Sequence, residues 1–332
     1  MMQLNNTISA SITAIGGYVP EERLTNKDLE SIVDTNDEWI QSRTGIKERR
    51  LLKDPKKATS FLAIQASKDL IIKNKVDPLT IDMVIVATTT PDMQIAATAA
   101  YVSSEIGTNN AFGYDLQAAC SGFLYAMSMA SGKIESGRYK KILVVGADKM
   151  SSVIDYKDRS TCILFGDGAG AVLFEPNNEG FGWIDEYFKS NGKDRESLCV
   201  KAGGSLFPAT SSSILKGDHY LRQDGRKVFK SAVSAMTEAS KNILNRNNLV
   251  GKDIDYLIAH QANERIIEAI ADRMKLEPKK VLKNISDYGN TTAATIPLLL
   301  YDFKNQFKKG DKIIFAAFGG GYTWGAAYYT WS

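Results

Sequence analysis

The sequence has 332 residues, of which 44% are hydrophobic and 24% charged, and its formal net charge is +3. A chain of this size can bury one large core or two fused ones. The small charge argues against a protein that binds nucleic acid through a broad basic face, although a local basic patch could receive an acidic partner. The first residues show no basic segment followed by an apolar run, and no apolar run reaches about 18 residues. We therefore expect neither a signal peptide nor a membrane span.

Three cysteines are present: Cys120, Cys162 and Cys199. An odd, sparse set is a poor disulfide framework and suits the reducing cytoplasm, where we place the protein. Cys162 lies in an apolar, strand-like run and is expected in the core. Cys199 falls within residues 190–225, which are rich in Gly, Ser and Lys. We expect this stretch to form an irregular excursion near a ligand entrance or a subunit contact.

Two pairs of short apolar runs indicate an internal duplication. Residues 81–87 (IDMVIVA) resemble residues 254–259 (IDYLIA), and residues 140–148 (KKILVVGAD) resemble residues 311–319 (DKIIFAAFG). Both pairs are separated by about 172 residues, roughly half of the chain, which makes chance similarity the weaker explanation. Continuous runs rich in Ile and Val are typical of strands that are buried on both faces.

Helix-like stretches separate these predicted strands. Residues 123–134 carry apolar side chains at helical spacing, and residues 263–274 form an amphipathic pattern with Asn263 near its cap. Strands and helices that alternate in two similar halves predict an α/β fold, in which two duplicated halves form a layered αβαβα sandwich. We place the two halves at residues 1–176 and 177–332.

Cys120 lies in the segment DLQAACSGFLYAM, between an apolar run and a predicted helix. A thiol at a helix N-terminus faces unpaired backbone N–H groups and the positive end of the helix dipole. That setting predicts a lowered pKa and an available thiolate. A buried structural cysteine is the alternative. The small residues around Cys120 favour the approach of a ligand over core packing, so we interpret Cys120 as a nucleophile.

Two further polar residues occupy positions where ligands bind. His260 directly follows the run IDYLIA, and ligands of open α/β sheets bind at the carboxyl ends of strands. The chain has only two histidines, and the other lies in a loop-like segment. Asn290 lies in a Gly-Asn turn before a predicted helix, where it could simply cap that helix. Thr291 or Thr292 could provide the cap equally well and leave Asn290 free.

Residues 318–322 (FGGGY) follow the last predicted strand. Consecutive glycines allow close approach of the backbone and offer N–H groups to an oxyanion. A tight turn or a phosphate cradle is the alternative interpretation of this loop.

Together these segments resemble the ketoacyl-acyl carrier protein synthase III family, the initiating condensing enzymes of bacterial fatty acid synthesis, which have a thiolase-like fold. The resemblance runs over essentially the whole chain, and the order and spacing of its segments fit as well. The segments are DTNDEWIQSRTGIKER (34–49), AACSGF (118–123), LFGDGAGAV (164–172), HQANERI (260–266), YGNTTAATIP (288–297) and FGGGYTWGA (318–326).

The resemblance implies that Cys120, His260 and Asn290 form the catalytic triad of an acyltransferase. Cys120 would take an acyl group from acyl-CoA. Malonyl-acyl carrier protein would then lose carbon dioxide and attack the acyl group, while His260 and Asn290 donate hydrogen bonds to its thioester carbonyl. The N–H groups of Cys120 and Gly320 would hold the oxyanion, and Phe318 would form an apolar wall. No metal or redox cofactor is implied.

The resemblance also implies sites for both substrates, and a homodimer. The residues implied to contact coenzyme A are Trp39, Arg43, Thr44, Arg159, Gly225, Phe229, Ala262 and Asn263. The acidic carrier protein would dock on Lys230, Arg265 and Arg273. The alternative for Trp39 is a position in the core. The alternative for each basic residue is a solvated surface charge that binds no partner.

The sequence departs from the family pattern at two positions. Ile95 stands where many relatives carry a Phe that crosses the dimer interface to floor the acyl pocket. The smaller side chain indicates a roomier pocket, which puts acetyl as the sole primer in doubt. Beside Arg273, a basic pair of some relatives is replaced by Asp272-Arg273, which could weaken or redirect docking of the carrier protein.

Several other activities remain open from the sequence. Elongating condensing enzymes use two histidines, whereas this chain has Asn at position 290. Thiolases use a second cysteine late in the chain, whereas no cysteine follows Cys199 here. Both classes are therefore disfavoured. A condensing enzyme of secondary metabolism with a different primer or acceptor is the main alternative. A cysteine hydrolase can also order Cys, His and Asn along the chain, and a dimerising scaffold without activity is conceivable. The duplication and the implied nucleotide site at Trp39 favour a condensing enzyme over a hydrolase.

Overall fold

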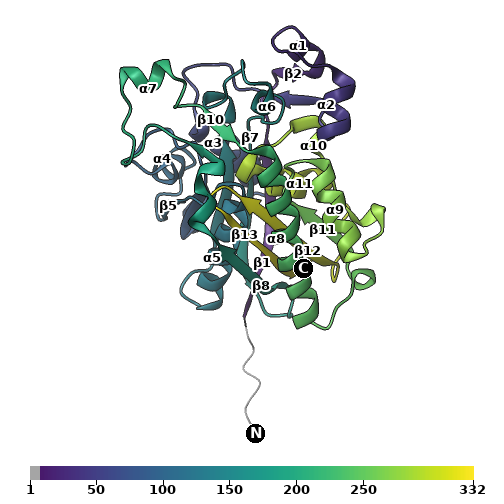
Figure 1. Cartoon of the computed structure of the whole chain (residues 1–332). Coiled ribbons are helices and arrows are strands. Elements are labelled where there is room, and N and C mark those ends of the chain that lie inside the picture. The colour runs from purple at the N-terminus through teal and green to yellow at the C-terminus, as the bar shows by residue number, and fades with distance from the viewer. Residues whose placement is uncertain (1–7) are drawn as a thin grey trace.

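The computed structural model describes residues 8–332 and contains two main β-sheets with helices packed on their faces (Figure 1). The first sheet has the strand order β1-β7-β6-β4-β5. Its strands are β1 (Ser9–Tyr18), β4 (Met83–Ala87), β5 (Phe112–Leu116), β6 (Ile142–Asp148) and β7 (Gly168–Asn177). Every residue of β4 and β6 is buried, as expected for apolar strands covered on both faces.

The second sheet repeats the topology of the first. Its order is β11-β12-β13-β8, and its strands are β8 (Gly182–Ser190), β11 (Tyr256–Ala259), β12 (Lys312–Gly319) and β13 (Thr323–Thr330). Each sheet contains a parallel pair, β4 with β6 or β11 with β12, that is extended by two antiparallel strands, and the first sheet has β5 as an additional parallel strand beside β4. The four apolar runs paired in the sequence are these parallel strands, which confirms the duplication. The predicted boundary between residues 176 and 177 falls at the end of β7 and stays a prediction.

The helices form three layers around the two sheets, which confirms the predicted αβαβα sandwich. One layer covers the outer face of the first sheet, a second lies between the sheets, and a third covers the outer face of the second sheet. In that order the layers are α3 (Thr59–Lys73) and α4 (Thr98–Glu105), α5 (Gly122–Glu135) and α11 (Thr295–Phe303), and α8 (Gly225–Arg246) and α9 (Glu264–Met274). As predicted, the side chain of Asn263 caps α9 by accepting from the N–H of Arg265.

Shorter elements surround the layers, mostly at the end of the molecule that lies uppermost in Figure 1. They are β2 (Arg23–Thr25), α1 (Asn26–Glu30), α2 (Asp37–Thr44), β3 (Glu48–Arg50), α6 (Arg159–Cys162), β9 (Leu198–Val200), α7 (Ser211–Leu215), β10 (Leu221–Gln223) and α10 (Ile285–Tyr288). The predicted excursion at residues 190–225 is therefore partly ordered into β9, α7 and β10, and β9 pairs with β10.

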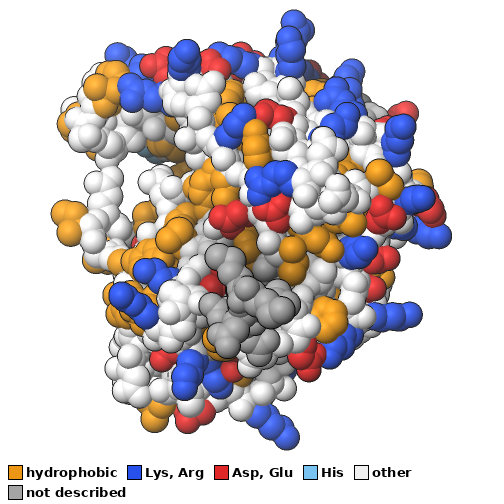
Figure 2. Space-filling view, turned by 90° about the horizontal axis from the view of Figure 1, so that it is seen from below, with side chains coloured by type: hydrophobic (Ala, Val, Ile, Leu, Met, Phe, Trp, Pro, Cys, Tyr) orange, Lys and Arg blue, Asp and Glu red, His pale blue; other side chains and the backbone are white. Residues whose placement is uncertain are grey.

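The surface mixes charges of both signs. On the face seen from below, Lys and Arg side chains alternate with Asp and Glu side chains (Figure 2). Over residues 8–332 no helix combines the length and the apolar character needed to cross a bilayer.

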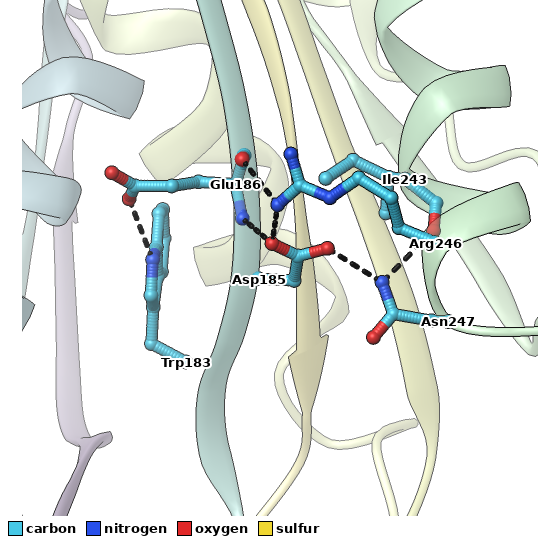
Figure 3. Close-up of polar contacts among 6 residues, drawn as sticks. All are labelled: Trp183, Asp185, Glu186, Ile243, Arg246 and Asn247. Carbon is cyan, nitrogen blue, oxygen red and sulfur yellow. Dashed lines mark hydrogen bonds and ion pairs between the residues drawn. The ribbon is translucent and has the colours of Figure 1, made fainter.

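Helix α8 is fixed to the second sheet at its C-terminal end. Asp185 on β8 accepts hydrogen bonds from Arg246, the last residue of α8, and from Nδ2 of Asn247 at 2.7 Å (Figure 3). Arg246 also donates to the carbonyl of Glu186, at 3.0 Å. These contacts hold the far end of the helix whose first turns line the cavity described below.

The segment that carries Asn290 packs directly on the first sheet because a glycine makes room for it. A Cβ atom at Gly146, in the middle of β6, would lie 2.3 Å from the carbonyl oxygen of Ala293. No side chain fits at that distance, so β6 and residues 290–294 can approach this closely only with glycine at position 146.

We predict that Gly146→Ala lowers the thermal unfolding midpoint and reduces activity. The added methyl group must push β6 and Ala293 apart, and overpacking of this kind costs about 1–3 kcal/mol. Gly132→Ala is the matched control, because Gly132 lies in α5 with no atom within 4 Å of an added Cβ. This control should raise stability by roughly 0.5–1 kcal/mol. Equal unfolding midpoints for the two variants would contradict the close approach.

Candidate active site

Cys120, His260 and Asn290 line one cavity, together with Phe318. Cys120 comes from the first half of the chain, whereas the other three come from the second. The cavity therefore forms where the two sheets meet, at the carboxyl ends of the parallel strands β11 and β12. Ligands are expected at these strand ends in α/β folds.

Cys120 sits in a tight turn, the 3₁₀ segment Ala119–Ser121, which continues into α5. Ala119 has a positive φ of 47°, which is rare for a residue with a side chain and fixes the direction of the turn. The end of β12 packs against this turn, since a Cβ at Gly319 would lie 2.7 Å from the Cys120 nitrogen. The sulfur is thereby held at the junction of the two halves.

The expectation of a lowered thiol pKa is wrong for the unliganded site. Cys120 is only 7% exposed, and burial together with the negative charge of Asp148 raises its pKa to about 12. Contact with its own backbone N–H lowers the pKa but is the smallest of these effects. Loss of hydration thus outweighs the helix N-terminus, so the resting residue is a neutral thiol.

His260 is held in a fixed orientation and carries no charge. Its backbone N–H donates to Ala316 O on β12 at 2.8 Å, and its Nδ1 lies 2.7 Å from the hydroxyl of Thr295. The residue is 2% exposed, and burial lowers its pKa to about 3. A neutral imidazole with Nδ1 already bonded presents its Nε2 to the cavity.

Asn290 is fixed through its backbone and through one end of its side chain. Its N–H donates to Leu164 O at 2.8 Å, and its carbonyl accepts from Gly166 N–H at 3.1 Å. Its Oδ1 accepts from the N–H of Thr292 at 2.8 Å, so the expectation that a threonine would leave Asn290 entirely free is wrong. Within residues 8–332 no acceptor bonds to Nδ2, which leaves the amide N–H groups for a ligand.

The two residues expected beside the triad lie on different cavities. Phe318 is 4% exposed, lines the same cavity as His260 and packs on Tyr322 with ring centroids 4.8 Å apart. Gly320 lines a second cavity, which also reaches Cys120. Cys120 therefore separates two spaces, one with His260 and Asn290 and one with Gly320.

The residues expected to bind coenzyme A fall into two groups. The first group lines the cavity that holds Cys120 and His260 and consists of Gly225, Phe229, Ala262 and Asn263. The second group lies outside this cavity, on α2 and α6, and consists of Trp39, Arg43, Thr44 and Arg159. A hydrogen bond from Asn263 Nδ2 to Arg43 O, at 2.9 Å, joins the two groups.

Within the second group, two residues form a surface pair and one is turned inward. Trp39 is 36% exposed, and the guanidinium of Arg159 lies 5.2 Å from its ring centroid. A partly exposed ring of this kind is not a core anchor. Thr44 is buried, and its hydroxyl already donates to Ile40 O at 2.6 Å and accepts from Ile46 N–H at 3.1 Å.

The basic residues expected to receive the carrier protein lie on α8 and α9. Lys230, Arg265 and Arg273 are all exposed. The guanidinium of Arg265 lies 5.4 Å from the ring centroid of Phe229, which lines the cavity. Arg273 donates to Val233 O at 3.3 Å, so part of its hydrogen-bonding capacity is used within the chain.

Ile95 lies at the surface rather than in either cavity of its own chain. Its side chain is fully exposed and its φ is +76°, which is rare for a β-branched residue. The neighbouring Gln94 donates to Gly203 O at 2.7 Å, which ties the 93–95 loop to the excursion.

Most of the second cavity was not predicted from the sequence. Cys199, Arg195 and Leu198 reach it from the excursion, and Thr89 and Thr90 from the loop after β4. Only the general expectation that the excursion borders a ligand entrance pointed in this direction. Cys162, by contrast, is 1% exposed in the core as expected.

A buried carboxylate beside the triad was also missed. Asp148 ends β6 and is fully buried, and it accepts hydrogen bonds from residues 88–90 and 292–293. The only sequence signal was a charged residue placed directly at the end of an apolar strand.

Comparison with protein families adds independent support. Residues 114–192 match the model described as 3-Oxoacyl-[acyl-carrier-protein (ACP)] synthase III, and residues 244–331 match the model of its C-terminal part. A beta-ketoacyl-[acyl-carrier-protein] synthase III of Bacteroides thetaiotaomicron is 52% identical over 98% of this chain and 97% of its own length. The synthase III of Chlorobium chlorochromatii is 52% identical over 98% of this chain and 100% of its own length.

Solved structures agree with the sequence relatives. The crystal structure of the synthase III of Aquifex aeolicus has a TM-score of 0.89 and 39% identity over 97% of this chain and 100% of that chain. The priming beta-ketosynthase of the R1128 polyketide biosynthetic pathway also has a TM-score of 0.89, with 30% identity over 97% of this chain and 96% of that chain. The chain thus belongs to the 3-oxoacyl-[acyl-carrier-protein] synthase III family of thiolase-like condensing enzymes.

Proposed function

We propose that this acyltransferase condenses an acyl-CoA primer with malonyl-acyl carrier protein, giving 3-oxoacyl-acyl carrier protein, CoA and carbon dioxide, and so initiates fatty acid synthesis. The observation that carries the proposal is the single cavity lined by Cys120, His260, Asn290 and Phe318. It combines a nucleophile, two hydrogen-bond donors and an apolar wall. The chemistry uses no metal or redox cofactor.

In the first half-reaction the sulfur of Cys120 attacks the thioester carbonyl of acyl-CoA. The bond between the acyl carbon and Cys120 forms, the bond to the CoA sulfur breaks, and the thiol proton leaves with CoA. The N–H groups of Cys120 and Gly320 stabilise the oxyanion of the tetrahedral intermediate. Because the resting thiol is neutral, its deprotonation accompanies the attack rather than preceding it.

In the second half-reaction the carboxylate of the malonyl group leaves as carbon dioxide. Nε2–H of His260 and Nδ2–H of Asn290 donate to the thioester carbonyl, where the enolate charge develops. Phe318 withholds solvation from the departing carboxylate. The enolate carbon then attacks the acyl group, and the released sulfur of Cys120 takes up a proton.

Both substrates enter through the cavity that holds His260. We assign the pantetheine arm of CoA to the cavity wall around Phe229 and Asn263, and the nucleotide to the Trp39–Arg159 pair and Arg43. The hydrogen bond between Asn263 and Arg43 O supports continuity between the two parts. The carrier protein docks on Lys230, Arg265 and Arg273, which are exposed on α8 and α9, the helices that contribute Phe229 and Ile266 to the cavity wall.

We propose a cytoplasmic homodimer. Three free cysteines fit a reducing compartment. The first sheet ends at the edge strand β5, on the side where Figure 2 shows hydrophobic side chains along the left margin. Exposed large apolar residues occur on β5, on α4, in the loop before α4 and in the excursion: Phe112, Tyr101, Met93, Ile95, Leu206, Phe207 and Leu215. An unpaired edge strand with such a patch is typical of a subunit interface.

A condensing enzyme of secondary metabolism is the second candidate. The fold shared with the priming beta-ketosynthase of a polyketide pathway favours it, as does the roomy second cavity. Turnover with malonyl-acyl carrier protein compared with malonyl-CoA, over a panel of acyl-CoA primers, distinguishes the two candidates.

We predict that Cys120→Ser abolishes formation of the acyl-enzyme, because a serine hydroxyl without a base is a much weaker nucleophile than a thiol. Intact-protein mass spectrometry after exposure to acyl-CoA measures the adduct. Cys162→Ala is the control and should retain it, since Cys162 is buried in another part of the core. An adduct that maps to Cys162 or Cys199 would overturn the assignment.

We predict that His260→Ala and Asn290→Ala slow decarboxylation more than acyl transfer. Removal of one donor to a developing oxyanion costs about 10²–10³ in kcat. Release of carbon dioxide from malonyl-acyl carrier protein and acylation of Cys120, measured separately, test the split. Equal losses in both steps would argue against the proposed roles.

We predict that Ile95→Phe shifts primer preference toward acetyl-CoA. A larger side chain that enters the partner's acyl cavity shortens the space for the primer, and one methylene is worth about 1–3 kcal/mol of discrimination in an apolar pocket. The ratio of kcat/KM for acetyl-CoA and for longer acyl-CoAs measures the shift. Ile72→Phe is the control, since Ile72 is exposed on α3, away from both cavities. An unchanged ratio in Ile95→Phe would exclude Ile95 from the acyl pocket.

A further inference from the structure

The buried carboxylate of Asp148 joins two loops that border the catalytic cysteine. Its Oδ1 lies 2.7 to 3.1 Å from N–H and hydroxyl groups of Thr88, Thr89 and Thr90. Its Oδ2 accepts from the hydroxyl of Thr292 and from the N–H of Ala293, the latter at 3.1 Å. Within residues 8–332 no Lys or Arg forms an ion pair with Asp148. Donors surround both oxygens, which is the environment that an ionised carboxylate requires.

From Thr292 the contacts lead to both donors of the triad. The N–H of Thr292 donates to Oδ1 of Asn290 at 2.8 Å. The carbonyl oxygen of Thr292 lies 3.1 Å from the hydroxyl of Thr295, which lies 2.7 Å from Nδ1 of His260. Thr292 itself has a φ of +51°, a conformation that is unfavourable for a β-branched residue and persists only where the surroundings fix it.

We propose that Asp148 is the positioning residue of this site. It fixes Thr292, which orients Asn290 directly through its N–H and places its carbonyl beside the Thr295 hydroxyl that holds Nδ1 of His260. The inference rests on the proposed function of the two side chains as donors to the malonyl thioester. It extends that function by naming the group that sets their geometry.

The contacts also determine which atoms face the substrate. With Oδ1 of Asn290 held by Thr292, its Nδ2 is the end that is left to donate. The hydroxyl of Thr295 has a single proton. When the hydroxyl gives that proton to Nδ1 of His260, at 2.7 Å, rather than to Thr292 O, at 3.1 Å, the ring hydrogen resides on Nε2, which is the tautomer that donates into the cavity.

The same carboxylate has an opposite effect on the nucleophile. Its charge adds to burial in opposing the thiolate of Cys120. The other titratable groups that share a cavity with Cys120 are His260, which is neutral, and Arg195 and Cys199 across the second cavity. Removal of the charge at Asp148 should therefore make the thiol easier to ionise while it disturbs the decarboxylation donors.

The substitution Asp148→Asn tests this pair of effects. The variant should lose decarboxylation by about 10²-fold, the size expected when reacting groups are misplaced by about 1 Å. The pH midpoint for alkylation of Cys120 by iodoacetamide should move to lower pH, with transfer of the acyl group from acyl-CoA maintained. A residue that merely supports the fold would reduce all three quantities together.

Two further variants separate position from charge. Thr292→Val keeps the shape of the side chain but removes its hydroxyl, so decarboxylation should fall while the alkylation midpoint stays at the wild-type value. Thr292→Ser retains the hydroxyl and should restore decarboxylation. Because these variants leave Asp148 in place, they decide the question even if Asp148→Asn fails to fold.

The outcomes distinguish this inference from the proposed function. If the wild-type enzyme forms no acyl-Cys120 and releases no carbon dioxide, the proposed function fails. If the wild-type enzyme is active but Thr292→Val decarboxylates at the wild-type rate, the positioning role of Asp148 is wrong. If Asp148→Asn folds and leaves the alkylation midpoint unchanged, the opposing effect on Cys120 is wrong.

Discussion

The active site depends on how closely the two halves of the chain approach each other. The turn that holds Cys120 touches the end of β12 at Gly319, and β6 touches the segment that carries Asn290 at Gly146. At both contacts a Cβ atom would fall within 3 Å of backbone atoms of the other half. Two glycines therefore bring Cys120, the proposed nucleophile, from one half and its proposed partners His260 and Asn290 from the other half to one cavity. The duplication supplies the matching strand ends, and the glycines permit the contact.

Exclusion of water is the second constraint on the site, and its consequence is that the triad is uncharged. Burial keeps Cys120 as a thiol and His260 as a neutral imidazole. In the proposed second half-reaction Cys120 is acylated, so the neutral N–H donors of the other two residues stabilise the enolate while the apolar wall withholds solvation from the departing carboxylate. The site is suited to the second step, in which an enolate must be stabilised where no water is available.

The sequence predicted what repeats or follows a regular period. Apolar runs at a fixed offset gave the paired strands, and motif order gave the positions of Cys120, His260 and Asn290. Properties that depend on packing were predicted wrongly. The pKa of Cys120 is raised rather than lowered, because burial has a larger effect than the helix N-terminus. Asp148 could not be identified, because its partners lie on loops separated from it by about 60 and 144 residues. The position of the excursion in the sequence was predicted correctly. That its residues Leu198 and Cys199 line a cavity together with Cys120 was not predicted.

The residues proposed for catalysis lie beside the two main sheets, whereas residues of the excursion line the cavity in which we expect substrate selectivity to be determined. His260, Asn290 and the Cys120 turn are fixed by strand ends, by buried hydrogen bonds and by glycines, so a substitution there disturbs the core. Arg195, Leu198 and Cys199 line the second cavity from a short 3₁₀ turn and the short strand β9, outside the two main sheets, and Ile95 lies on a surface loop. We expect changes at these positions to alter the shape and polarity of the proposed acyl cavity at small cost to the fold. The departure from the family pattern at Ile95 lies in this adaptable part, because there the choice of primer can change while the catalytic geometry is retained.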